Sequence, residues 1–155
     1  MNYPVEAVKI NELEQLGLLF KAEDNERFIR ERSARIAKGD ATIYAVKHDD
    51  RPIAEVTIVY NNEQYEDYTI PKKRVYMEAL RVLDEYQGKG IGQRLLEEVI
   101  KKVKSQGYSE ITIGVEDDNE VAKHIYSKLG FNEFIRRDHG DEYDPCDYNV
   151  YLKRL

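Results

Sequence analysis

Apolar residues in this chain recur with two different periods, and the period changes several times along the sequence. Alternation of apolar and polar residues predicts a strand, whereas apolar residues three and four apart predict a helix. The pattern therefore predicts a mixed α/β domain that fills residues 1–155. The predicted strands are residues 5–10, 42–47, 53–60, 76–82, 111–115, 131–136 and 149–155, and the predicted helices are residues 11–38, in one or two pieces, 91–103, and a short helix between residue 118 or 119 and residue 130.

The segment that links the fourth strand to the second helical region is rich in glycine. Residues 87–92 read Gln-Gly-Lys-Gly-Ile-Gly, and the helical pattern begins at Ile91. Glycine adopts positive φ and lets backbone N–H groups approach a ligand closely. The first turn of a helix adds unpaired N–H groups and the positive end of the helix dipole. The segment therefore predicts a cradle for a pyrophosphate.

Two common phosphate motifs do not fit this segment. The Walker pattern Gly-x-x-x-x-Gly-Lys-Ser/Thr is absent from the chain, and the dinucleotide pattern Gly-x-Gly-x-x-Gly fails because its last position falls on Gln93. A nucleotide-binding protein is therefore disfavoured. The pattern that remains is Gln-x-x-Gly-x-Gly.

A second motif follows the predicted strand at residues 111–115. Asn119, Ala122 and Tyr126 are three and four residues apart, so a helix would present an amide, a methyl group and a phenol on one face. Val121 and Ile125, with Leu129, would form an adjacent face suited to the core. An amphipathic helix with a half-buried tyrosine is the alternative interpretation.

Composition narrows the class of protein. The 155 residues are 41% hydrophobic and 35% charged, with a net charge of −6, so we expect a globular protein with no nucleic-acid partner. No apolar run approaches the roughly 20 residues of a membrane helix, and no signal peptide is visible, which predicts no membrane association and a cytoplasmic location. Cys146 is the single cysteine, and the three histidines lack the spacing of metal ligands, so we expect no metal.

Together the two motifs resemble those of the GNAT superfamily of N-acetyltransferases. The first is similar to the acetyl-coenzyme A loop of that family, and the second, Asn-x-x-Ala-x-x-x-Tyr-x-x-x-Gly-Phe, occupies residues 119–131. The resemblance implies the GNAT fold, a mostly antiparallel sheet with a splayed central parallel strand pair and flanking helices. It also implies direct transfer of an acetyl group from acetyl-CoA, the cosubstrate, to a primary amine.

The resemblance assigns roles to individual residues. Tyr126 would protonate the departing thiolate, a backbone N–H near Leu80 would face the oxyanion, and Glu78 is the candidate general base. Simple alternation gives Glu78 the parity of Leu80 and leaves its sheet face open. A strand-edge carboxylate paired with a lysine, and a water that relays the proton, both remain alternatives. The implied cofactor-binding residues are Leu80, Val82, Gln87, Gly88, Lys89, Gly90, Ile91, Gly92, Gln93, Asn119, Ala122 and Tyr126, to which Arg94 could add.

Two acidic, tyrosine-rich segments, residues 63–68 and 138–148, predict the acceptor. Carboxylates and aromatic rings suit a small cationic amine, and Tyr143, Asp144 and Asp147 are the candidate substrate-binding residues. Ordinary solvated loop charge is the alternative. A non-catalytic acyl-CoA-binding regulatory module, acetylation of a protein amine, and a homodimer also stay open. Arg81 lies in the fourth strand and is predicted to pair with an acid, and contact with a ligand is the alternative.

Overall fold

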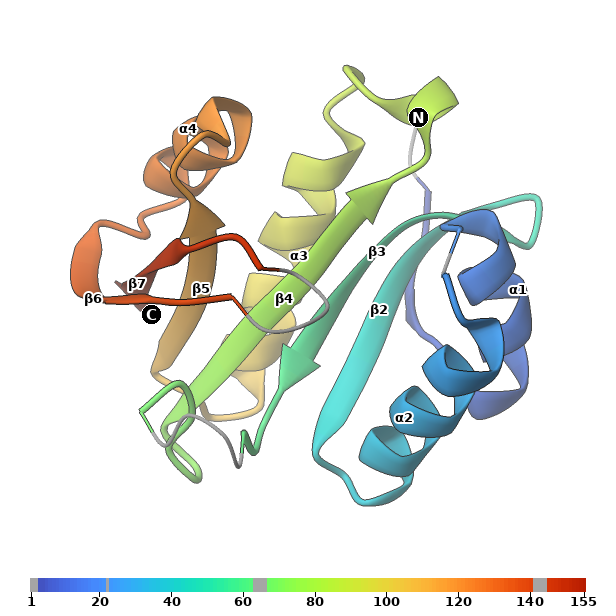
Figure 1. The fold of residues 1–155 in the computed structure, drawn as a ribbon, viewed down its shortest axis with the longest axis horizontal. Helices are drawn as coiled ribbons and strands as arrows, with labels where there is room; N and C mark the ends of the chain where they lie inside the picture. Colours follow the sequence, from blue (N-terminus) through green and yellow to red (C-terminus); the bar gives the residue numbers. More distant parts are fainter. Residues whose placement is uncertain (1–2, 22, 63–66, 141–144) are drawn as a thin grey trace.

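The protein, described here from a computed structural model, is a seven-stranded mixed sheet with helices on both faces (Figure 1). The structure describes residues 3–21, 23–62, 67–140 and 145–155. The strand order is β1-β2-β3-β4-β5-β7-β6, and among the described strands only β4 and β5 pair in parallel. The strands are β1 (Val5–Ala7), β2 (Ala41–His48), β3 (Arg51–Val59), β4 (Arg74–Val82), β5 (Glu110–Glu116), β6 (Glu133–Asp138) and β7 (Tyr148–Arg154), and the helices are α1 (Leu13–Leu19), α2 (Asn25–Ala37), α3 (Ile91–Ser105) and α4 (Glu120–Lys128).

The predicted elements are confirmed in kind and order, and they differ at a few boundaries. The first strand ends at Ala7 rather than at Ile10, and Ile10 instead begins the 3-10 helix η1 (Ile10–Glu12). The helical region at residues 11–38 is two helices, since the Asp24 side chain accepts a hydrogen bond from the Arg27 backbone N–H and starts α2. A further 3-10 helix, η2 (Asp84–Tyr86), was not predicted and leads into the glycine segment.

Two apolar layers hold the helices to the sheet. Leu95, Leu96, Val99 and Val103 of α3 are fully buried against one face, and α4 contacts the same cluster. Helices α1 and α2 cover the other face, where Leu16 is fully buried. Figure 1 shows α1 and α2 on the side of the sheet opposite α3.

The parallel pair β4 and β5 separates towards its carboxyl ends. The register runs from Arg74 opposite Glu110 to Met77 opposite Ile113, and no later residue of the two strands is paired with the other. Strand β4 continues to Val82 and β5 continues to Glu116. The predicted splay of the central strands is therefore present, and it opens the sheet at the end from which the glycine segment leaves.

A β-bulge in β4 decides which side chains face this opening. Thr57 pairs with Glu78 and Glu55 pairs with Arg81, so Ala79 and Leu80 together lie opposite one residue of β3. Ala79 has a φ of +59°, a left-handed conformation that is uncommon for a residue with a Cβ. The extra residue places Glu78 towards α2 and Leu80 towards α3. The sheet face of Glu78, which simple parity left open, is therefore the face opposite that of Leu80.

Candidate active site

A cleft of about 510 Å³ lies between the end of β4, the glycine segment, the start of α3 and one face of α4. All of the predicted cofactor-binding residues except Lys89 line it. The full lining is Leu80, Val82, Tyr86, Gln87, Gly88, Gly90, Ile91, Gly92, Gln93, Asn119, Val121, Ala122, Ile125 and Tyr126. Two motifs that are about 30 residues apart in the sequence thus meet across one opening.

The glycine segment has the geometry of an anion cradle. Gly88 and Gly90 both have a φ of +76°, and a Cβ on either would meet no atom within 4 Å. Gly90 is the N-cap residue of α3, no side chain caps this end, and the first turn carries no acidic residue. Backbone N–H groups and the positive end of the helix dipole are therefore presented to the cleft. The Gln87 side chain donates to the carbonyl oxygen of Val82 at 3.0 Å and fixes the start of the loop.

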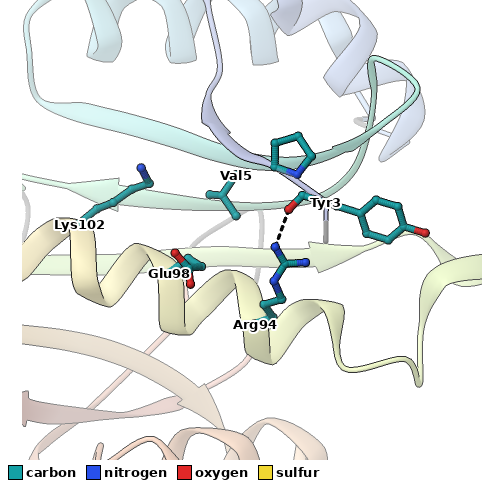
Figure 2. A pocket seen from close by; sticks show the side chains of 6 residues that line it. Tyr3, Val5, Arg94, Glu98 and Lys102 are labelled. Atoms are coloured by element: carbon teal, nitrogen blue, oxygen red, sulfur yellow. Dashed lines mark hydrogen bonds between the residues drawn. The ribbon is translucent and has the colours of Figure 1, made fainter. Parts of the chain in front are cut away.

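The two cations near the loop lie differently from the expectation. The ammonium nitrogen of Lys89 stands 5.4 Å from the centroid of the Tyr86 ring, so this side chain covers an aromatic wall of the cleft. Arg94 points away, and its guanidinium donates to the carbonyl oxygen of Tyr3 at 2.7 Å. Figure 2 shows this contact in a second hollow, of about 280 Å³, beside Glu98 and Lys102. The suggested contribution of Arg94 to the cradle is therefore not seen.

Helix α4 supplies the opposite wall. The Asn119 side-chain oxygen accepts a hydrogen bond from the Ala122 backbone N–H at 3.1 Å, which makes Asn119 the N-cap of the helix. Ile125 packs on the core as predicted. Val121 does not: it is 72% exposed, because it lies on the cleft side of the helix rather than on the face that contacts the sheet. The prediction of a core role for Val121 is wrong.

Tyr126 is placed to hold a proton in the cleft. Its ring packs edge-on against Phe131, with ring centroids 5.8 Å apart. Burial raises the pKa of Tyr126 to about 12, so the hydroxyl stays protonated at neutral pH. A protonated phenol beside an apolar wall can donate to a developing anion.

The opposite face of β4 carries the candidate base. Glu78 accepts a hydrogen bond from the guanidinium of Arg35 at 2.9 Å, and a guanidinium nitrogen of Arg32 lies 3.5 Å away. The alternative of a carboxylate paired with a lysine is therefore wrong in its partner, because the cationic groups beside Glu78 are arginines. Arg81 donates to Glu55 at 2.6 Å, which confirms its predicted pairing with an acid. Burial raises the pKa of Glu55, against the opposing effect of Arg81.

The acidic segments are seen in part. Tyr143 and Asp144 lie outside the described residues, as do residues 63–66. Asp147 is described, and it lies 2.9 Å from His139 and 3.7 Å from Arg137. Asp67 and Asp138 both pair with Arg136. Each of these three carboxylates thus faces a cationic group, which lowers the excess of negative charge that the sequence suggested.

Two kinds of feature are absent from the part of the chain that the structure describes. No group of three or more histidine, cysteine, aspartate or glutamate side chains there is arranged to hold a metal ion. None of the helices there combines the length and the apolar character that crossing a bilayer requires.

Sequence reasoning missed Tyr86 as part of the site. The residue lies in η2, and its hydroxyl is 2.9 Å from a ring nitrogen of His48. The sequence does place an aromatic residue directly before the glycine segment. Whether the Tyr86 side chain faces the cleft, however, depends on the 3-10 helix η2, which was not predicted.

Comparison with known proteins places the chain in a family. The family model described as "Acetyltransferase (GNAT) family" matches residues 9–131. N-alpha-acetyltransferase 30 of Schizosaccharomyces pombe is 36% identical over 63 residues, which are 41% of this chain and 42% of that protein. Thialysine N-epsilon-acetyltransferase of Mus musculus is 33% identical over 58 residues, 37% of this chain and 34% of that protein. The matches thus span less than half the length of these relatives.

Solved structures agree on the fold. An N-acetyltransferase from Staphylococcus aureus Mu50 superposes with a TM-score of 0.76 at 16% identity and covers 99% of both chains. The Salmonella typhimurium protein yncA, solved with its cofactor acetyl-CoA, has a TM-score of 0.75 at 15% identity, over 100% of this chain and 95% of that one. Because the family model matches residues 9–131, which is most of its length, the chain belongs to the acetyltransferase (GNAT) family.

Proposed function

We propose that this protein is an N-acetyltransferase that moves an acetyl group directly from acetyl-CoA to a primary amine. The observation that carries the proposal is a single cleft that joins the uncapped start of α3 to the hydroxyl-bearing face of α4. The relatives add support, since two of them are named for acetylation of amines and the yncA structure holds acetyl-CoA.

The residues of the cleft fit acetyl-CoA. Gly88 and Gly90 leave open space where a side chain would otherwise stand, so the diphosphate can approach the N–H groups of the loop. The unpaired ends of β4 and β5 leave backbone groups near Leu80 and Val82 for the amide-containing pantetheine arm. When bound, acetyl-CoA supplies an acetyl group activated as a thioester.

The reaction requires two proton transfers, and we assign each of them to one side chain. The amine nitrogen bonds to the acetyl carbon as the carbon–sulfur bond breaks, so the amine must give up a proton and the sulfur must gain one. Tyr126 holds a proton at its hydroxyl and is the donor to sulfur in this proposal. Glu78, one residue before the bulge, takes the amine proton either directly or through water.

For the acceptor, we retain a small amine that arrives as a cation. The segment at residues 138–148 is acidic and tyrosine-rich, and Tyr68 and Tyr148 hydrogen-bond to each other at 2.8 Å beside Asp138. A protein amine is the second candidate, favoured by the match to an N-alpha-acetyltransferase. A binding module without turnover would have no use for the half-buried phenol of Tyr126.

Thiol release from acetyl-CoA tests this function. The protein is mixed with acetyl-CoA and a panel of primary amines, and free coenzyme A thiol is measured, while calorimetry measures acetyl-CoA binding separately. We expect binding, and amine-dependent thiol release that Tyr126→Phe reduces. Binding without release for any amine, including amino-terminal peptides, would leave a regulatory binding module and overturn the proposal.

A further inference from the structure

Five charged side chains gather on the face of the sheet opposite the cleft. We call them the arginine cluster: Arg32 and Arg35 of α2, Glu55 of β3, and Glu78 and Arg81 of β4. Three guanidinium groups thus meet two carboxylates, and the cluster has one positive charge more than it has negative charges.

The cluster also has more hydrogen-bond donors than acceptors. Both Arg32 and Arg35 are directed at the same oxygen of Glu78, at 3.5 and 2.9 Å. The Arg32 nitrogen nearest to Glu78 is buried and makes no hydrogen bond with any described residue. Burial lowers the pKa of Arg32, against the opposing effect of Glu78. One oxygen of Glu55 is also buried without a hydrogen-bond partner, so the geometry of the cluster leaves one acceptor unused. Because a guanidinium carries five N–H donors, three of these groups still offer more donors than two carboxylates can accept.

Aromatic rings hold two of the guanidinium groups in place. The Arg81 guanidinium lies 5.4 Å from the centroid of the Phe20 ring, and that of Arg32 lies 5.5 Å from the Phe28 ring. The Arg35 and Arg81 side chains remain 32% and 35% exposed. The rings therefore hold the guanidinium groups of Arg32 and Arg81, while about a third of the Arg35 and Arg81 side chains stays accessible to a ligand.

The arginine cluster lies next to the bulge of β4, close to the proposed site of acetyl transfer. Glu78 directly precedes Ala79, and Leu80, one residue later, lines the cleft on the other face. If an acceptor approaches the bulge of β4 from the side of α2, its amine lies near Glu78. The remainder of the acceptor then lies next to the arginine cluster.

We propose that the acceptor carries a carboxylate as well as its amine, and that the arginine cluster binds this carboxylate. The inference rests on the proposed function and narrows the acceptor to amino carboxylates. The carboxylate accepts hydrogen bonds from the partly exposed guanidinium groups of Arg35 and Arg81. The ammonium end of the same molecule lies towards Glu78 and the bulge. A planar carboxylate can accept two parallel hydrogen bonds from one guanidinium.

Pairs of amines that differ only in the carboxylate test the inference on the wild-type protein. Lysine is compared with cadaverine, and β-alanine with ethylamine, by thiol release from acetyl-CoA. Removing a charge-assisted hydrogen bond costs enough to change kcat/KM by roughly tenfold to a hundredfold. We therefore expect the member with the carboxylate to be preferred by at least about tenfold. Equal or better use of cadaverine and ethylamine would overturn the inference.

A variant links that preference to the cluster. Arg35→Gln should raise KM for the preferred amino carboxylate while leaving the Kd for acetyl-CoA unchanged, and the preference within each pair should shrink. Arg27→Gln is the matched control, since Arg27 lies on the same helix and pairs with Glu31 at 2.8 Å. A preference that survives in Arg35→Gln, or shrinks equally in Arg27→Gln, would contradict the assignment.

Failure of the inference and failure of the function give different results. If amines are acetylated without regard to a carboxylate, the acetyltransferase stands and the inference falls. If acetyl-CoA binds and no amine of either kind releases thiol, both proposals fall.

Discussion

A ring nitrogen of His48 lies 2.9 Å from the hydroxyl of Tyr86, and this contact joins the end of β2 to the wall of the cleft. Tyr3 also packs against the imidazole, with ring centroids 4.9 Å apart, and the ammonium group of Lys89 covers the Tyr86 ring. The start of the chain, the turn between β2 and β3, and the glycine segment are therefore connected through one histidine.

His48→Ala should weaken acetyl-CoA binding without changing the folded state. A neutral hydrogen bond is worth about 0.5–1.5 kcal/mol, so the Kd should rise roughly twofold to tenfold as Tyr86 loses its support. Calorimetry measures the Kd, and His124→Ala is the control because His124 is exposed on α4. An unchanged Kd in His48→Ala would show that Tyr86 keeps its position without this contact.

Gly90 and Gly39 form a natural pair for testing the cradle. Both have a φ of +76° and open space where a Cβ would stand, but Gly39 follows α2 and Gly90 begins α3 at the cleft. Alanine at either site should cost about 1 kcal/mol of folding free energy, because a Cβ strains this conformation. Only Gly90→Ala should also weaken acetyl-CoA binding, and a bulkier residue there by more than about tenfold.

If Gly39→Ala and Gly90→Ala changed acetyl-CoA affinity equally, the effect would come from stability alone. Chemical denaturation of both variants, run beside the calorimetry, separates the two contributions.

The parts of the site that follow from local rules could be predicted from the sequence. Gly90 stands where a strand pattern ends and a helical pattern begins, and Tyr126 lies seven residues after Asn119 on the same helix face. Both depend on spacing within one element, so the sequence shows them directly. The bulge at Ala79 could not be predicted in this way, since its sequence carries no glycine and the extra residue is visible only in the pairing with β3.

Ion pairs between residues far apart in the sequence also could not be predicted. The partners of Glu78 come from α2, 43 residues earlier in the case of Arg35, and Arg136 meets Asp67 from across 69 residues. The prediction from the sequence counted the carboxylates of the acidic segments, Asp67 among them, as free to attract a cationic amine. Pairing depends on which elements pack together, so the electrostatic character of the acceptor side could not be determined before the topology was known.

Gly114 should not tolerate a side chain. It is the first residue of β5 beyond its pairing with β4, and a Cβ there would lie 2.7 Å from the Tyr148 ring and 3.0 Å from the Tyr76 hydroxyl. Overpacking of this kind costs about 1–3 kcal/mol, so Gly114→Ala should lower the free energy of unfolding by that amount. Combination with Tyr148→Ala should cost less than the two single changes added together, because the ring that collides is gone. Full additivity would contradict the predicted collision.

Tyr126→Phe should lower turnover far more than acetyl-CoA affinity. The phenol's proton matters when the sulfur departs, so its loss acts on the transition state, where general acid catalysis is worth about 100-fold to 10,000-fold. Tyr108→Phe is the control, since Tyr108 precedes β5 and stacks on Tyr60 at the amino end of that strand. Equal kcat in wild type and Tyr126→Phe, with chemistry shown to limit the rate, would remove Tyr126 from the mechanism.

The raised pKa of Tyr126 gives an alkaline signature for the same residue. Burial raises this pKa to about 12, whereas a tyrosine in the unfolded chain titrates near its ordinary value of about 10. Between these values the folded state holds the proton and the unfolded state releases it, so the contribution of Tyr126 to stability is present below pH 10 and is lost as the pH rises towards 12. Between pH 9 and pH 11 the unfolding free energy of the wild type, measured with urea, should therefore fall relative to that of Tyr126→Phe. Over the same pH range, titration of Tyr126 should not lower the kcat of the wild type, because the phenol of the folded protein is still protonated. Any decline in kcat should therefore also occur in Tyr126→Phe. A constant difference in unfolding free energy would mean that Tyr126 titrates normally and that the cleft does not exclude water from its hydroxyl.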